Sequence, residues 1–479
     1  MDIMDLASKG IVAITKRFGN KIKKNETAPV IPQEKPQIIS GAGYRAGFAT
    51  AEIMPDLTKG KTYYIAGHGS GHVMEGVITP VYISAVWLDC GGDEGMLWLG
   101  ADIVGLTRVE VNKIRSMILA SPVISGCKCI NFSCTHSHSG IDTVGYWGKP
   151  NLVSIPSNGK DAEYMDMLME TAVKVSEEAY KSRKSGKLYS GSIVAKDSLV
   201  SGRVFADRHE VVSRLRFTPD DGSNDIWILN FGGHPNSLGG SNRMLSGEYP
   251  YFMREEIAKA NGAKVLFGIG AIGGMDAAML DDEDRVNCVK LQGKMVADAA
   301  MAISNDRELE PVIKFIQQPF YLPDGNYVLT LLAMRGVMSF KAYPCDESDM
   351  GIALLTELTY MTIGDQKLLF LPGESFVSTV YGSYNDAETS STGEGPEVNP
   401  LPLAEIAGDD SMITFGVSND MTGYVVPVNE FVLNPTQPYL NGYRDRFDRN
   451  HYHETNSMGL LTQKTIADAF AAVVKSFNS

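Results

Sequence analysis

Short apolar runs alternate with segments of helical period along most of the chain. Strands are expected where β-branched and aromatic residues gather in short runs between glycine-rich or polar turns. These runs are residues 81–89, 96–104, 129–134, 186–195, 211–217, 225–231, 264–270, 313–321, 352–362, 367–371 and 412–417. Apolar spacings of three and four residues predict amphipathic helices at 107–120, 162–183, 249–260, 285–304 and 459–476. The mixture predicts an α/β fold with mixed β-sheets and surrounding helices.

The division of the chain follows from composition. No internal repeat and no sharp shift in composition is visible after residue 40, so we expect one large domain at 41–479. Residues 1–40 combine a stretch suited to a short helix with a proline-rich spacer. Basic residues alternate there with apolar ones, which is typical of an amphipathic helix that contacts an acidic membrane or another subunit. A solvated tail is the simpler expectation for residues 1–25.

Net charge and hydropathy exclude several classes of protein. The 479 residues contain 43 Lys and Arg against 57 Asp and Glu, a formal charge of −14, which repels phosphate backbones and argues against a nucleic-acid partner. No apolar run reaches the roughly 18 residues of a transmembrane helix, and no signal peptide is recognised. The six cysteines form no Cys-x-x-Cys pair. We therefore expect a cytoplasmic protein with reduced thiols.

The sequence Cys134-Thr-His136-Ser-His138-Ser-Gly140 follows the apolar strand 129–134. Two imidazoles two residues apart at a strand end point the same way, so one can bind a metal while the other faces the same pocket. Paired histidines also occur as surface or hydrogen-bonding residues, and the motif alone leaves both interpretations open.

Three further candidates each come after a predicted strand. They are His234 in Phe231-Gly-Gly-His234-Pro, Glu374 in Leu371-Pro-Gly-Glu374-Ser, and Tyr424 in Met421-Thr-Gly-Tyr424. Taken singly, His234 is more often a buried core histidine, Glu374 is equally well explained as a helix cap, and packing is the default explanation of Tyr424. Taken together, they place nitrogen and oxygen donors at strand ends, where sites of α/β proteins gather. Such donors suit Zn²⁺ with water completing its coordination.

One glycine motif favours a different chemistry. Gly268-Ile-Gly270-Ala-Ile-Gly273 has the spacing of a dinucleotide-binding turn and follows the strand 264–270. No second strand ending in an acidic residue about 20 positions later follows it. We therefore expect these glycines to line the metal pocket, with a dinucleotide oxidoreductase as the alternative.

The order of the motifs THSHSG, FGGHPNS, LPGES and NDMTGY resembles the catalytic domain of the neutral ceramidases, which are zinc-dependent amide hydrolases. The resemblance extends from about residue 43 to the end of the sequence and also covers Ser201-Gly-Arg203. It implies that one Zn²⁺ is bound by His136, His234, Glu374 and Tyr424. It further implies that His138 is an acid/base or oxyanion partner and that Arg203 positions the substrate or polarises its carbonyl group.

Two departures from the family leave the substrate open. The loop Gly268–Asp276 has no serine where the family has a Ser/Asn-rich loop, and Phe431 stands where the family has a second tyrosine. We expect a zinc-dependent hydrolase of a carboxamide (N-acyl) or related acyl bond, acting on a small molecule or a lipid amide. The alternatives are an esterase or sugar-amide hydrolase with a small soluble substrate, and a non-catalytic metal-containing binding protein on the same fold.

Overall fold

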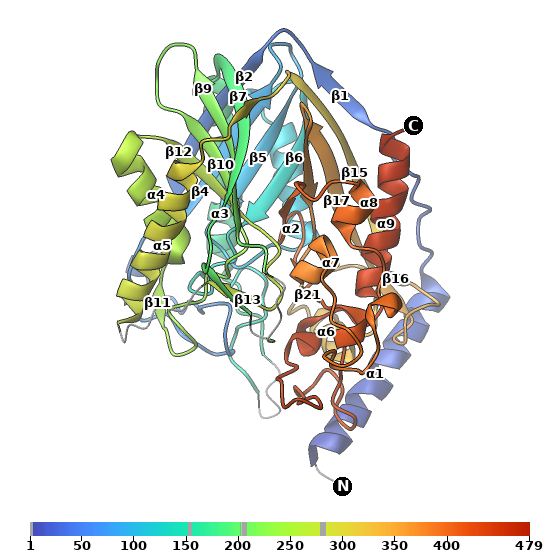
Figure 1. Cartoon of the computed structure of the whole chain (residues 1–479). Helices are drawn as coiled ribbons and strands as arrows, with labels where there is room; N and C mark the ends of the chain where they lie inside the picture. Colours follow the sequence, from blue (N-terminus) through green and yellow to red (C-terminus); the bar gives the residue numbers. More distant parts are fainter. Residues whose placement is uncertain (1–2, 152–155, 202, 204–207, 278–283) are drawn as a thin grey trace.

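Two β-sheets pack face to face and helices cover their outer faces (Figure 1). This computed structural model describes residues 3–151, 156–201, 203, 208–277 and 284–479. The predicted α/β class, with mixed sheets and surrounding helices, is confirmed.

The larger sheet has nine strands and takes in the first predicted strands of the chain. Its order is β12 (Lys264–Ile269), β10 (Ile226–Phe231), β9 (Val211–Pro219), β7 (Lys184–Val194), β2 (Tyr44–Glu52), β4 (Tyr82–Asp89), β5 (Gly95–Ala101) and β6 (Cys127–Cys134), with β14 (Arg307–Glu308) beside β7. The pairs β10/β12 and β5/β6 are parallel, and the other pairs are antiparallel.

The smaller sheet has six strands. Its order is β1 (Gln37–Ser40), β15 (Val312–Asp324), β17 (Ile352–Ile363), β18 (Gln366–Phe370) and β20 (Ile413–Phe415), with β16 (Ala342–Pro344) beside β17. Only β18/β20 is parallel among its pairs in the described part of the chain. Short two-stranded ladders join β3 (Gly76–Val77) to β11 (Met244–Leu245), β8 (Leu199–Ser201) to β13 (Met275–Ala277), and β19 (Glu374–Ser375) to β21 (Tyr424–Val425).

Helices form the two outer layers. Those on the nine-stranded sheet are α2 (Arg108–Leu119), α3 (Ala162–Lys181), α4 (Glu248–Asn261) and α5 (Arg285–Ala302). Those on the six-stranded sheet are α1 (Ile3–Asn25), α6 (Tyr327–Met334), α7 (Val377–Tyr381), α8 (Leu403–Ala407) and α9 (Thr462–Phe477). Single 3₁₀ turns lie in the connections, at η1 (Leu57–Lys59), η2 (Pro396–Val398), η3 (Val428–Glu430) and η4 (His453–Asn456).

The core between the sheets is built by strand alternation. In β5, Trp98 faces the six-stranded sheet while its neighbours Leu97 and Leu99 face the helices, because successive side chains point to opposite faces. The Trp98 ring makes edge contacts with Phe370 and Phe415, at centroid distances of 4.6 and 4.5 Å. Strands covered on both faces read as continuous apolar runs, which is why the sequence predicts them well.

The N-terminal segment differs from the solvated tail expected for it. Helix α1 runs from Ile3 to Asn25, and Ile11 and Thr15 are buried against the six-stranded side of the molecule. The Thr15 hydroxyl lies 3.5 Å from the Met350 sulfur, and the backbone at Gly19 comes close to the Met350 carbonyl. The burial of these side chains against the rest of the protein therefore stabilises the helix, which does not depend on intrinsic helix propensity alone.

No helix in the described ranges is long and apolar enough to cross a membrane. None of the six cysteines, all of which lie in the described ranges, forms a disulfide, and four of them are buried.

Candidate metal centre

The predicted site residues come from both sheets and meet where the sheets adjoin. His136 and His138 lie directly after β6, and His234 follows β10 of the same sheet. Glu374 lies on β19, after β18 of the other sheet, and Tyr424 lies on β21, after β20. The site therefore joins the carboxyl ends of strands from both sheets, as the strand-end positions predicted.

Backbone hydrogen bonds tie these loops together. The amide of Cys134 donates to the Val417 carbonyl at 3.2 Å, and that of His138 to the Pro235 carbonyl at 3.0 Å. The Glu374 amide donates to the Gly423 carbonyl at 2.9 Å, which sets β19 beside β21. The segments that carry His138 and Glu374 are thus each held by a neighbouring loop of the site.

The backbone of the site is strained. His136, Val417 and Asn419 have φ values of 61°, 44° and 64°, in the left-handed region that residues with a Cβ rarely adopt. Each such residue costs on the order of 1–3 kcal/mol and persists only where its surroundings impose it. For Asn419 the surroundings include its own side chain, whose Oδ1 accepts a hydrogen bond from the Phe132 amide at 2.9 Å. The strain lies in the segments that carry or adjoin the donors.

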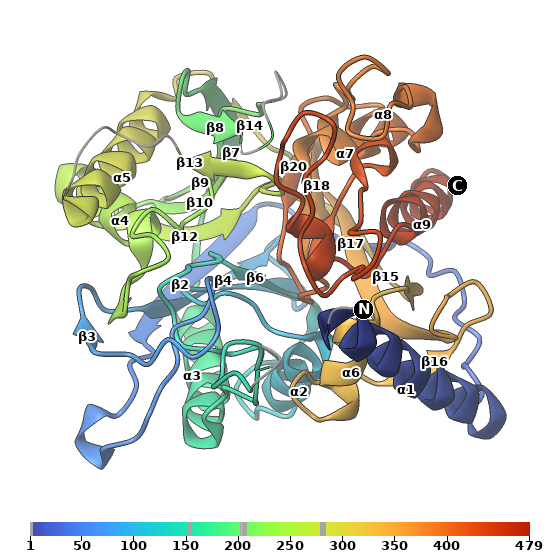
Figure 2. The ribbon, with the colours of Figure 1, turned by 90° about the horizontal axis from the view of Figure 1, so that it is seen from below.

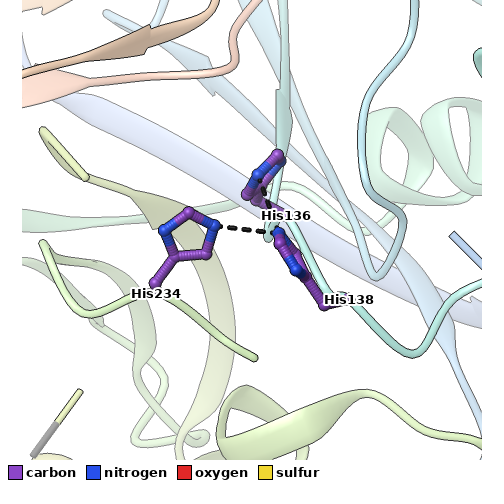
Figure 3. Close-up of side chains that lie close together, drawn as sticks. All are labelled: His136, His138 and His234. Carbon is purple, nitrogen blue, oxygen red and sulfur yellow. Dashed lines mark hydrogen bonds between the residues drawn. The ribbon is translucent and has the colours of Figure 1, made fainter. Parts of the chain in front are cut away.

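Three imidazoles converge on a point (Figure 3), and the Glu374 carboxylate lies beside them. Nε2 of His138 lies 3.2 Å from Nε2 of His136 and 2.9 Å from Nε2 of His234. Oε2 of Glu374 lies 3.3 Å from Nε2 of His136 and 3.8 Å from Nε2 of His234. All four side chains are buried.

The three ring nitrogens cannot satisfy one another. Nδ1 of His136 lies 2.5 Å from the Val104 carbonyl and must donate to it, which leaves the neutral ring with a lone pair on Nε2. His138 Nε2 faces both partners and carries either one proton or one lone pair. It can therefore donate to only one of the two neighbours, and one contact between nitrogens lacks a shared proton. A cation at the point of convergence would accept lone pairs from all three nitrogens and would remove this unfavourable contact.

Burial favours the neutral form of His138 and His234. Burial, followed by repulsion from the other imidazoles, lowers the pKa of His138 well below its ordinary value. Burial and His136 likewise lower the pKa of His234, to about 4. Burial alone raises the pKa of Glu374, but its interactions with His136, then with His234 and Tyr424, outweigh burial, so the net direction is downward. Neutral imidazoles beside an ionised carboxylate are the protonation states that bind a divalent metal.

Tyr424 is linked to this group through its hydroxyl, which donates a hydrogen bond to the Glu374 carboxylate. Burial and then the Glu374 charge raise the pKa of Tyr424 well above its ordinary value. A second phenol, that of Tyr452, shares a hydrogen bond with Tyr424. No sequence pattern selects Tyr452, because it follows no predicted strand and lies in a long irregular segment.

A cavity of about 620 Å³ opens onto the donors. Its walls include His136, His138, His234 and Glu374, together with Tyr424 and Tyr452. Much of the remaining wall is apolar or aromatic, formed by Val109, Val144, Tyr146, Trp147, Leu329, Met338, Phe340, Leu354, Met421 and Met458. Its size and its few convergent polar groups are typical of small-molecule sites.

His68 also lies on the wall of this cavity, and its ring makes an edge contact with that of His138 at 4.9 Å between centroids. Burial, then the charge of His72, lowers the pKa of His68. His68 is thus a fourth imidazole, which contacts His138 but is not one of the three whose nitrogens converge.

Arg203 lies in a different environment. It is fully buried, and its guanidinium donates to Glu454 at 2.8 Å, to His453 at 3.1 Å and to the Glu430 carbonyl at 3.2 Å. It is not among the described residues that line the cavity. Its neighbours at 202 and 204–207 lie outside the described residues.

The glycines of Gly268–Gly273 were expected to line the pocket, but the described cavity wall contains none of them. They allow close packing instead. A Cβ added to Gly270 would lie 3.2 Å from the Gly232 backbone, and one added to Gly273 would lie 2.6 Å from the Phe376 nitrogen. The segment therefore presses against the chain next to His234 and Glu374.

No protein-family model matches the sequence, and no curated protein sequence matches it. Solved structures do match the fold. Neutral ceramidase from Pseudomonas aeruginosa superposes with a TM-score of 0.66 at 16% identity, covering 91% of this chain and 74% of that one. A structure described as ceramidase complexed with C2 gives a TM-score of 0.65 at 15% identity, covering 90% and 75% of the two chains. The chain has the neutral ceramidase fold.

The ceramidase fold extends over nearly the whole chain, so the predicted resemblance is confirmed at the level of the fold. Identities of 15 and 16% explain why sequence comparison alone finds no relative. At this identity the comparison concerns architecture, and the chemistry has to be argued from the side chains.

Proposed function

We propose that the protein is a metal-dependent hydrolase that cleaves a carboxamide (N-acyl) bond, with Zn²⁺ as its metal. The convergence of three buried imidazole nitrogens and the Glu374 carboxylate on the wall of a cavity carries this proposal. His136, His234, Glu374 and Tyr424 are the ligands that we assign to the ion. The ceramidase fold of the chain supports the same class of reaction.

The donor set fits zinc on chemical grounds. Imidazole nitrogen and carboxylate oxygen are common zinc ligands, and the unsatisfied contact among the three nitrogens marks a place for a cation. When bound, such an ion polarises a carbonyl group and supplies a hydroxide nucleophile at neutral pH. The donation from His136 to the Val104 carbonyl fixes the imidazole in the orientation that a ligand requires.

The remaining polar groups have separate roles in the proposal. His138 is neutral, faces the cavity, and can take a proton from a nucleophile and pass it to a leaving amine. Tyr452 holds the Tyr424 hydroxyl through its hydrogen bond. For Arg203 we propose a positioning role. Its ion pair with Glu454 holds η4, whose His453 ring lies 4.7 Å from that of Tyr424.

The cavity supports a lipid amide as the substrate. Apolar walls remove an acyl chain from water, a gain of about 0.8 kcal/mol for each buried methylene group. The imidazoles and the Glu374 carboxylate lie together on this wall, where the amide carbonyl would lie, and the wall also includes the charged Arg108, Lys341 and Asp420. A small soluble metabolite would leave most of the apolar wall without a partner. Because the donors face an open cavity, the geometry also gives no support to a closed, non-catalytic metal site.

Metal analysis of purified protein tests the proposal. We expect about one equivalent of zinc in the wild type and at least a ten-fold lower affinity in His136→Ala and Glu374→Gln. His72→Ala is the matched control, since His72 lies outside the described cavity wall. Fluorogenic N-acyl amides of increasing chain length then measure activity. A wild type that binds no stoichiometric metal, or variants that bind it as the wild type does, would refute the proposal.

A further inference from the structure

Helix α1 presents a basic face to solvent. Ile11, Thr15 and Gly19 lie on its buried side, against the rest of the molecule. The opposite side, which we call the α1 face, is exposed and consists of Leu6, Lys9, Ala13, Ile14, Lys16, Arg17, Lys21 and Lys24. Leu6 and Ile14 are 56% and 50% exposed, although both are apolar. The face therefore combines cations with exposed apolar side chains.

The charges of this face are not neutralised by the protein. Among the residues that the structure describes, Lys9, Lys16, Arg17, Lys21 and Lys24 form no ion pair, whereas Lys23 pairs with Asp346 at 2.8 Å. The whole chain carries a formal charge of −14, so the α1 face stands out against an acidic molecule. Charge complementarity directs such a face toward an extended anionic surface.

The α1 face adjoins the cavity. Helix α1 packs against α6 and β16, and Leu329 of α6 lies on the cavity wall. Lys341, which directly precedes β16, is exposed and also lines the cavity, so it marks the rim. Seen from below, α1 lies on the viewer's side of the molecule beside α6 and β16 (Figure 2). The basic helix therefore packs against α6 and β16, and residues of α6 and next to β16 line the cavity.

We infer that the α1 face docks the protein on an anionic lipid bilayer and brings the rim of the cavity to its surface. Each Lys or Arg near an anionic membrane surface increases binding about five-fold, and lysine stems lie along the interface while their charges stay in water. Leu6 and Ile14 add apolar contact at the headgroup level. The docking itself is independent of the chemistry, but its purpose, delivery of a lipid amide from the bilayer, rests on the proposed function.

Co-sedimentation of the full chain with vesicles tests this inference. The vesicles contain phosphatidylcholine alone or with 30% phosphatidylserine. We expect binding only to the anionic vesicles at 0.1 M NaCl, its loss at 0.5 M NaCl, where the screening length falls to less than half, and no competition by 10 mM inorganic phosphate. The variant K9Q/K16Q/R17Q/K21Q should bind more than about 100-fold more weakly. K174Q/K181Q/K259Q/K294Q is the matched control, because it removes the same charge from exposed lysines of α3, α4 and α5.

Equal binding by the two variants, or no binding of the wild type to anionic vesicles, would overturn the inference. Salt-sensitive binding to a DNA duplex without vesicle binding would also overturn it, in favour of a nucleic-acid partner. Thermal melts of both variants check that they fold. Zinc content and turnover of a soluble N-acyl amide are measured in parallel, so a failed docking surface with intact activity is distinguished from a failed proposed function.

Discussion

At the scale of single residues, His138 has two possible roles in the proposed mechanism, as a metal ligand or as a proton carrier. Its Nε2 lies within 3.2 Å of the Nε2 atoms of His136 and His234, so geometry alone makes it a third candidate ligand. Its position two residues after His136 was predicted to bring both rings to one pocket, and the structure places both there. Substitution of His138 by alanine distinguishes these two roles, because only the loss of a ligand removes the metal.

If His138 carries protons, His138→Ala should keep about one equivalent of zinc and lose activity by about 10²- to 10⁴-fold, the usual contribution of a general acid or base. His136→Ala, in contrast, should lose both metal and activity. Metal content by mass spectrometry and turnover of an N-acyl amide make the comparison. Loss of metal in His138→Ala to the same extent as in His136→Ala would show that His138 is a ligand.

Glu248 is a second residue whose environment predicts a measurable effect. It is fully buried at the start of α4, where its Oε1 accepts a hydrogen bond from the Ser139 hydroxyl at 2.8 Å. Burial raises its pKa from 4.5 to about 7. A raised pKa means that the folded state prefers the protonated acid, so this stabilisation is complete below about pH 4.5 and is lost as pH rises through 7.

Glu248→Gln should therefore stabilise the protein at high pH relative to the wild type, because the amide has no charge to bury. Between pH 5 and pH 8 the difference in unfolding free energy between variant and wild type should grow by about 2–3 kcal/mol. Urea unfolding at both pH values measures it. Glu255→Gln, on the exposed side of the same helix, is the control and should show no such pH dependence. A difference that is the same at both pH values would contradict the prediction.

At the scale of elements, the donors are placed by the turns that follow strands. The predicted helix 107–120 and strand 129–134 match α2 (Arg108–Leu119) and β6 (Cys127–Cys134) within a few residues. Short strands such as β1 and β8 and the short helices α7 and α8 escaped prediction, and so did two longer elements, α6 and β2. Helix α6 is apolar on nearly every side, so it shows no helical period. Strand β2 contains three alanines and a glycine, residues with low strand propensity, and becomes a strand only between β4 and β7.

The contact of Gly273 with β19 gives a prediction at this scale. The Gly273 amide donates to the Ser375 carbonyl at 2.9 Å, and an added Cβ would lie 2.6 Å from the Phe376 nitrogen. Gly273→Ala should therefore displace the strand that carries Glu374 and weaken metal binding by at least ten-fold, since displacements near 1 Å are costly in such sites.

Gly92→Ala is the matched control, because an added Cβ at Gly92 has no neighbour within 4 Å. It should bind metal as the wild type does. Isothermal titration of zinc into the metal-free proteins makes the measurement. Unchanged affinity in Gly273→Ala would show that β19 does not depend on this close approach.

At the scale of the whole molecule, the proposed metal site joins two sheets. His136 and His234 follow strands of the nine-stranded sheet, while Glu374 and Tyr424 follow strands of the six-stranded sheet. The strained residues His136, Val417 and Asn419 lie on both sides of this junction. A bound ion would therefore stabilise the packing of one sheet against the other as well as the local loops.

Removal of the metal should lower the melting temperature. A ligand present at 100 times its Kd stabilises the folded state by about 2.7 kcal/mol, which for a chain of this size corresponds to a rise of only a few degrees. Chelator-treated protein should regain this difference when zinc is added back, as measured by differential scanning fluorimetry. His136→Ala should show no response. A wild type that melts at the same temperature with and without zinc would contradict a site shared by the two sheets.

The sequence by itself determined the order and type of most elements, because apolar period and turn residues act over a few neighbouring positions. It also placed the candidate donors at strand ends. Only the tertiary structure decided which of those ends meet, because the distance between His234 and Glu374 depends on sheet order and not on any local pattern. The pairing of Arg203 with Glu454, the recruitment of Tyr452 and the packing of α1 beside the cavity have the same origin. Each is a contact between segments far apart in the chain, fixed by how the two sheets and their helices bury apolar surface against one another.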